Sequence, residues 1–178
     1  MMRAALNVLV ILALAGGAYF VSWPAVMADA GSPEVELNAE NLGPRPIEEL
    51  TEKSITRDYG HAWQTMAAAL RENRSDLLDG YFTGIAKAIL AEEIAEQKRS
   101  GVRVRYTDQG HKLEAIFYSP SGDAMQLRDR ARLEVEIVDG DKVVHREDVT
   151  LNYLVLMTPG ADRWLVRDLQ TTAAEVRP

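Results

Sequence analysis

The chain has 178 residues, enough for one domain with a terminal appendage, and its 47% hydrophobic and 26% charged content is ordinary for a globular protein. It contains no cysteine, which excludes a disulfide framework, a thiol nucleophile and cysteine-ligated metal sites. The net charge of −7 is concentrated in residues 29–52, which hold seven acids and one base. The remainder lacks the basic excess that nucleic-acid binding requires, so we expect no nucleic-acid partner.

Residues 8–28 are an uncharged, mainly apolar run, long enough for a membrane-spanning helix. Tyr19, Phe20 and Trp23 lie near its far end, where aromatic rings favour the headgroup level. Small residues at the end of the run also fit a signal-peptidase site, so a cleaved signal stays open beside the favoured signal anchor. Arg3 precedes the run and acids follow it. This order predicts a single-pass protein of the cytoplasmic membrane, with its N-terminus inside and its C-terminal domain on the periplasmic or other extracytoplasmic side.

Composition divides the chain into four parts. Residues 1–28 are the predicted anchor, residues 29–54 an acidic, Pro-containing linker and helix lead-in, residues 55–172 the folded domain and residues 173–178 a tail. We interpret the linker as a spacer that lifts the domain off the membrane. The alternative is an extended arm that binds a neighbouring subunit.

Helical periodicity dominates the first half of the folded domain. An apolar stripe from Ile55 to Leu70 predicts a helix that begins between residues 47 and 55 and breaks at Asn73. A short helix is expected after a cap at Ser75, and a third helix from about residue 83 to 100. Gly101 then suits the position just past the end of that helix.

After Gly101 the apolar period becomes two, which is typical of strands with one wet face. Asp139 and Gly140 predict a hairpin turn. The strands are expected at residues 102–106, 113–118, 125–138, 143–157 and 164–169. The order predicts an α+β fold: one transmembrane helix, then three helices on one face of a curved, mostly antiparallel sheet of four or five strands. Without β-α-β alternation, parallel pairing is not expected.

This order resembles the nuclear transport factor 2-like superfamily, a cystatin-like cone of helices against a curved sheet. The resemblance covers about residues 55–172. It is carried by the helix with Tyr59 and Trp63, the segment 76–82, the long strand at 125–138 and the closing stretch 162–168 (DRWLVRD). With a single N-terminal span, the layout is similar to periplasmic inner-membrane subunits of type IV secretion systems and to Mce-associated proteins. The resemblance implies scaffold and interaction roles, often as homodimers.

The superfamily also includes ketosteroid isomerases, dehydratases and polyketide cyclases, which implies a pocket between the first helix and the sheet. Asp129 is the weak catalytic candidate, because it lies in the apolar phase of its strand and a raised pKa would suit a base. We favour the alternative, an arginine pair or a bulge that turns Asp129 outward. His61 is expected to be exposed, His111 to lie at a loop edge and His145 at the wet end of a strand. Their spacing indicates no metal site, and no cofactor is expected.

Two further groups of side chains are candidates for binding. Five aromatic residues could line an apolar pocket, although their spacing suits plain core better: Tyr59, Trp63, Phe82, Tyr153 and Trp164. The segregated charges on the wet face of the long strand form a candidate interaction face, with an ordinary solvated face as the alternative: Arg128, Arg130, Arg132, Glu134 and Glu136.

The predicted function is a non-catalytic, membrane-tethered interaction or scaffold domain, an accessory or assembly subunit of a membrane protein complex. Its expected partners are the bilayer, through the N-terminal segment, other subunits of that complex and a second copy of the chain. The alternative is a small-molecule or lipid-binding pocket domain of the isomerase or dehydratase kind.

Overall fold

The computed structural model describes residues 33–40 and 42–172. The predicted anchor, with Tyr19, Phe20 and Trp23, lies outside these residues, as does the choice between an anchor and a cleaved signal. Within the described part, no helix is both long and apolar enough to span a bilayer. The elements, in chain order, are β1 (Val35–Asn38), α1 (Glu49–Glu72), the 3₁₀ helix η1 (Ser75–Gly80), α2 (Gly84–Ser100), β2 (Val102–Tyr118), β3 (Met125–Asp139), β4 (Lys142–Pro159) and β5 (Trp164–Thr172).

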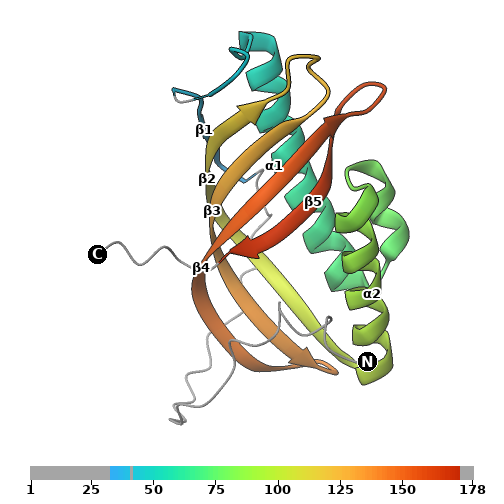
Figure 1. Ribbon diagram of the computed structural model, residues 1–178. Coiled ribbons are helices and arrows are strands. Elements are labelled where there is room, and N and C mark those ends of the chain that lie inside the picture. The colour runs from blue at the N-terminus through green and yellow to red at the C-terminus, as the bar shows by residue number, and fades with distance from the viewer. Residues whose placement is uncertain (1–32, 41, 173–178) are drawn as a thin grey trace.

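The five strands form one curved sheet in the order β1-β2-β3-β4-β5, with the helices on one side of it (Figure 1). Strands β2 to β5 pair antiparallel with their neighbours. This confirms the predicted α+β fold, in which three helices pack on a mostly antiparallel sheet. Burial alternates along β3: Leu127 faces the helices and is fully buried, whereas Arg128 is exposed. We call the side that faces the helices the inner face and the opposite side the outer face.

Helix α1 packs on the inner face because its apolar residues recur every three or four positions. Ile55, Tyr59 and Trp63 are each at most 4% exposed, so the predicted stripe is the buried stripe. The helix ends at Asn73, which adopts a left-handed φ of 54°. The backbone N–H of the following residue, Arg74, then donates to a carbonyl of the last turn, the closure typical of such an end.

Two further residues of α1 contact strands at opposite edges of the sheet. Asp58 is 1% exposed, and its Oδ2 accepts the backbone N–H of Trp164 in β5 at 2.8 Å. Gly60 lies against β1: a Cβ at this position would be 3.5 Å from Cγ2 of Val35. A methyl group at this position would thus be in ordinary van der Waals contact with β1.

Part of the predicted linker is a strand. Residues 35–38 form β1 and pair parallel with residues 111–114 of β2. The expectations of a segment without regular structure and of no parallel pairing are therefore wrong here. Four residues are too few to show an apolar period, and the partner strand follows only after the helices, which provide the long crossover that a parallel pair needs.

Several predicted boundaries also differ from the structure. The two strands expected before residue 118 are the single strand β2, whose register shifts twice, between Asp108 and Gly110 and between Ala115 and Phe117. Ser75 begins η1, and the preceding residue occupies the cap position. The predicted end of α2 is confirmed, with Gly101 at a φ of 76°.

Candidate functional site

A β-bulge in β2 brings two polar side chains to the inner face. Asp108 lies opposite Leu133 of β3, whereas Gly110 lies opposite Arg132, so Gln109 is an extra residue. Residues three apart in a regular strand point to opposite faces, and the extra residue cancels that alternation. Asp108 and His111 therefore share the inner face. Gly110 permits the bulge because its φ of 123° favours glycine.

The two side chains join a buried hydrogen-bond network with Asp129 of β3 and Tyr59 of α1. The imidazole of His111 bridges two carboxylates, with Nδ1 2.8 Å from Oδ2 of Asp129 and Nε2 2.7 Å from Oδ2 of Asp108. The hydroxyl of Tyr59 donates to the same Oδ2 of Asp129 at 2.7 Å. We call these four residues the Tyr59–Asp129–His111–Asp108 network. It ties the longest helix to two strands of the sheet.

The environment of His111 favours its charged form. Burial of the ring acts to lower the pKa of His111, but the hydrogen bonds and charges of Asp108 and Asp129 outweigh it and raise this pKa to about 9. Burial, together with the charge of Asp129, raises the pKa of Tyr59 well above its usual value. At neutral pH the network therefore contains an imidazolium held between two carboxylates and a phenol that remains a donor.

The network is closed to solvent on its inner side. Tyr59, His111 and Asp129 are each at most 2% exposed, and only the side chain of Asp108 reaches solvent, at 18%. The ring of Trp63 packs on His111 with centroids 4.5 Å apart and also contacts Tyr153 at 5.5 Å. Both ring nitrogens of His111 are already hydrogen-bonded. The arrangement holds α1 on the sheet and leaves one buried oxygen, Oδ1 of Asp129, without a hydrogen-bond partner among the described residues.

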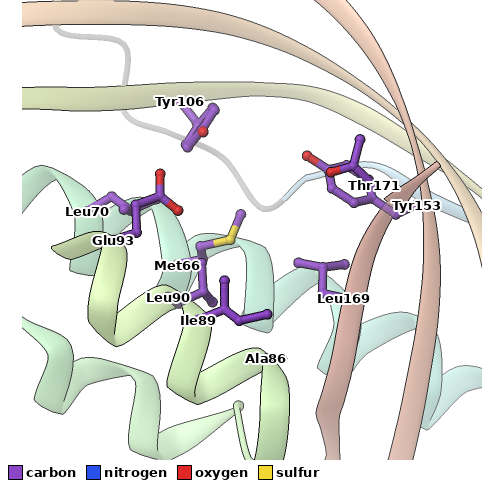
Figure 2. A pocket seen from close by; sticks show the side chains of 10 residues that line it. All are labelled: Met66, Leu70, Ala86, Ile89, Leu90, Glu93, Tyr106, Tyr153, Leu169 and Thr171. Carbon is purple, nitrogen blue, oxygen red and sulfur yellow. The ribbon is translucent and has the colours of Figure 1, made fainter. Parts of the chain in front are cut away.

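A separate cavity lies where α2 and the end of β5 meet the inner face. Its volume is about 40 Å³, and Tyr153 is the residue that it shares with the aromatic cluster around Trp63. Figure 2 shows the carboxylate of Glu93 rising from α2 toward the ring of Tyr106. Oε1 of Glu93 is buried without a hydrogen-bond partner in the part of the chain that the structure describes, and burial raises the pKa of this carboxyl. The cavity has room for about a water or two, far less than the roughly 300–1,000 Å³ of a typical ligand site.

We predict that Glu93→Leu raises the free energy of unfolding at pH 7 by about 1–2 kcal/mol, because it removes a buried carboxylate oxygen without a partner. The raised pKa means that the charged form of Glu93 destabilises the fold above pH 4.5 and that protonation relieves this cost as the pH falls. The gain should therefore shrink in denaturant titrations as the pH falls toward 4.5. Glu92→Leu, at an exposed neighbouring position, is the matched control. Equal effects of the two substitutions would contradict the prediction.

The outer face of the sheet carries a second candidate site. Lys112, Arg128, Arg130 and Arg132 are exposed neighbours on β2 and β3, and we call them the basic patch. Arg128 pairs with Glu114 at 3.3 Å and Lys112 with Glu36 at 3.5 Å. Arg132 donates only to the carbonyl of Gln109, and Arg130 forms no ion pair with any residue that the structure describes. Two positive charges of the patch thus have no carboxylate partner among the described residues.

The two acids of the predicted interaction face, Glu134 and Glu136, lie close to arginines of the same chain. Glu136 is 12% exposed in its side chain and pairs with Arg146, which also lies 3.9 Å from Glu134. Arg105 approaches Glu136 to 3.9 Å. The five residues of the candidate face thus lie side by side on β3. Its acids pair within the chain, whereas Arg130 and Arg132 have no carboxylate partner among the described residues.

The structure places the other candidate residues as follows. Asp129 faces inward and binds Tyr59 and His111, so the expected arginine pair or outward bulge is wrong. The expectation that His111 lies at a loop edge is also wrong, because it is 2% exposed within β2. The five aromatic pocket candidates are all buried, and Tyr153 is the one that lines the cavity; Phe82 bridges to Val166, and Trp164 lies near Tyr118.

Two histidines lie apart from the network. His61 of α1 is half-buried, with Nδ1 3.1 Å from Oε1 of Gln64. His145 of β4 is half-buried too, and its Nε2 is 3.6 Å from Oε1 of Glu147. Across the described residues, no group of three or more histidine or carboxylate side chains is arranged to hold a metal ion.

Solved structures share the fold of this chain, with helices on one side of a curved sheet. The intermembrane-space region of the chloroplast protein ARC6 superposes with a TM-score of 0.61 at 15% sequence identity, over 74% of this chain and 100% of that one. Aln2 from a Streptomyces species gives a TM-score of 0.47 at 14% identity, over 70% and 91% of the two chains. ActVI-ORFA from Streptomyces coelicolor gives 0.46 at 15% identity, over 71% and 97%. No protein-family model and no curated protein sequence matches the chain.

Proposed function

We propose that this chain is a non-catalytic, membrane-tethered interaction domain on the extracytoplasmic side, an accessory or assembly subunit of a membrane protein complex. Its basic patch binds an acidic surface of another subunit. The observation that carries this proposal is the outer face, which the described helices leave uncovered and on which Arg130 and Arg132 have no carboxylate partner among the described residues. Unneutralised charges on an open face favour an electrostatically matched partner.

The interior supports the same proposal. The network around His111 uses both ring nitrogens on carboxylates of the chain, and the cavity beside Glu93 is only about 40 Å³. An enzyme needs a reacting group that a substrate can reach. The ARC6 region with a similar fold lies in an intermembrane space, and this supports an extracytoplasmic location for the present domain.

The experiment uses the full chain expressed in its own host. A photo-crosslinking residue replaces Arg130, and a matched control carries it at Lys98, an exposed cation on α2. We expect a defined membrane-protein adduct from position 130 and none from position 98. The double substitution Arg130→Glu with Arg132→Glu should lower co-purification of that partner at least about tenfold, whereas Lys53→Glu with Lys98→Glu should not. An equal yield of adducts at both positions, or an unchanged complex in the arginine variant, would overturn the proposal.

The second candidate function is binding of a small molecule or lipid at the cavity beside Glu93. The specific observation in its favour is Ile89, which lines the cavity and is 46% exposed although apolar. A movement of this side chain would widen the opening. Native mass spectrometry of the chain purified from its host tests this function. A co-purifying molecule that Ile89→Glu removes would support the pocket, and an unloaded chain would count against it.

A further inference from the structure

Part of strand β4 has an edge with which no described residue pairs. Strand β5 pairs with β4 only between Asn152 and Pro159. Residues 142–151 of β4 pair with β3 on one side, and no described residue pairs with them on the other. Figure 1 shows this end of β4 extending beyond β5. An unpaired strand of this length exposes a row of backbone donors and acceptors about 30 Å long, which another strand can use.

The charges along this edge change sign at its middle. Lys142, His145 and Arg146 come first, and Glu147 and Asp148 follow them directly. An antiparallel partner centred on Glu147 would place Asp148 of the second copy opposite Arg146 of this copy, and Arg146 of the second copy opposite Asp148. The two Glu147 side chains are then the one like-charge pair. A parallel copy in register would instead align like charges, which is unfavourable for directly opposite residues.

We propose that two copies of this chain pair antiparallel along residues 142–151 of β4, about a two-fold axis perpendicular to the sheet near Glu147. Such an axis keeps the outer faces of both copies on one side. Arg146 and Asp148 both lie on the outer face, opposite Glu136 and Glu134 of β3. In the paired copies, each Arg146 lies directly opposite Asp148 of the second copy, and this contact occurs twice.

The inner-face side chains of the same edge also fit this register. His145 and Glu147 lie on it, opposite Ile137 and Val135. Nε2 of His145 is a buried atom without a hydrogen-bond partner in the described chain. Antiparallel pairing near Glu147 brings the carboxylate of the second copy diagonally across from His145, within reach of a long side chain. The second copy thus adds a carboxylate near Nε2 of His145, which in the single chain lies 3.6 Å from Oε1 of Glu147, beyond hydrogen-bond distance.

Charge inversion on each half of the edge tests the proposal in the full chain, with two differently tagged copies in mild detergent. The acidic-edge variant carries Lys142→Glu and Arg146→Glu, and the basic-edge variant carries Glu147→Lys and Asp148→Lys. We expect each variant alone to self-associate at least about tenfold more weakly than the unmodified chain. Mixing the two variants should restore association, because an acidic edge then lies beside a basic edge. Dimers that survive both inversions, or a mixture that stays monomeric, would overturn the proposal.

A cysteine scan gives an independent reading, because the chain contains no cysteine of its own. Residue 147 lies on the proposed axis, so Glu147→Cys should place two thiols opposite each other at a separation that a disulfide can bridge. Lys98→Cys on α2 is the matched control. We expect oxidation to cross-link the first variant and not the second. A monomeric unmodified chain, or equal cross-linking at both positions, would refute pairing along this edge.

Discussion

Replacing Asp129 by asparagine is expected to lower the free energy of unfolding by about 3 kcal/mol at pH 7, because it leaves a buried imidazolium with one carboxylate instead of two. Asp129 accepts hydrogen bonds from both Tyr59 and His111 through a single oxygen. Its loss therefore weakens the contacts of α1 with β2 and β3 together. Denaturant titration monitored by tryptophan fluorescence measures the effect, since Trp63 packs on His111.

The control for this substitution lies one position further along β3. Arg130 is exposed on the outer face, and Arg130→Gln should change the free energy of unfolding by less than about 0.5 kcal/mol. A double-mutant cycle with His111→Gln should give a coupling of about 1–3 kcal/mol between His111 and Asp129, as for other residues in one hydrogen-bond network. If Asp129→Asn costs no more than Arg130→Gln, the network does not stabilise the fold.

The second large effect is a loss of stability at alkaline pH. The pKa of His111 is about 9 in the folded chain and about 6.5 in the unfolded one. The protonated form therefore stabilises the fold fully below pH 6.5, and this contribution is lost as the pH rises through 9. The shift corresponds to roughly 3 kcal/mol, and free energies of unfolding measured from about pH 6 to 9.5 should fall by about this amount.

A substitution and an NMR titration test whether His111 is the group that causes the alkaline loss of stability. In His111→Gln, the free energy of unfolding should start lower and vary little over the same pH range, because the titrating group is gone. The Hε1 resonance of His111 in the folded chain should titrate with a midpoint near pH 9. A midpoint near 6.5 would mean that the two carboxylates do not hold the imidazolium, and the predicted alkaline loss would then be absent.

Much of the fold could be predicted from the sequence because its signals are periodic. The stripe from Ile55 to Leu70 indicated the buried face of α1, and the alternation along β3 indicated a sheet with one wet face. Local chemistry placed the end of α2 at Gly101. Strand β1 could not be predicted because its four residues are too few to show an apolar period. Its partner strand β2 also follows only after the helices.

The buried network could not be predicted because its residues meet only through the bulge at Gln109. On a regular strand Asp108 and His111 point to opposite faces, so the spacing in the sequence suggests no pair. The one local signal is Gly110, since a glycine within a strand often marks a bulge. The phase of Asp129 in its strand points inward, but the arginines next to it in the chain predict an ion pair. Its hydrogen-bond partner His111 instead lies across the sheet on β2.

The parallel pairing of β1 also determines how the domain would carry mechanical load. The carbonyl of Glu34 accepts the backbone N–H of His111 at 2.8 Å, so the N-terminal segment is bonded to β2 at the residue that centres the buried network. A pull on the residues before β1 acts along the strand direction and loads its hydrogen bonds together in shear. Such a pull would thus reach β2 at His111 before it reaches the other strands, and β1 would bear the load first.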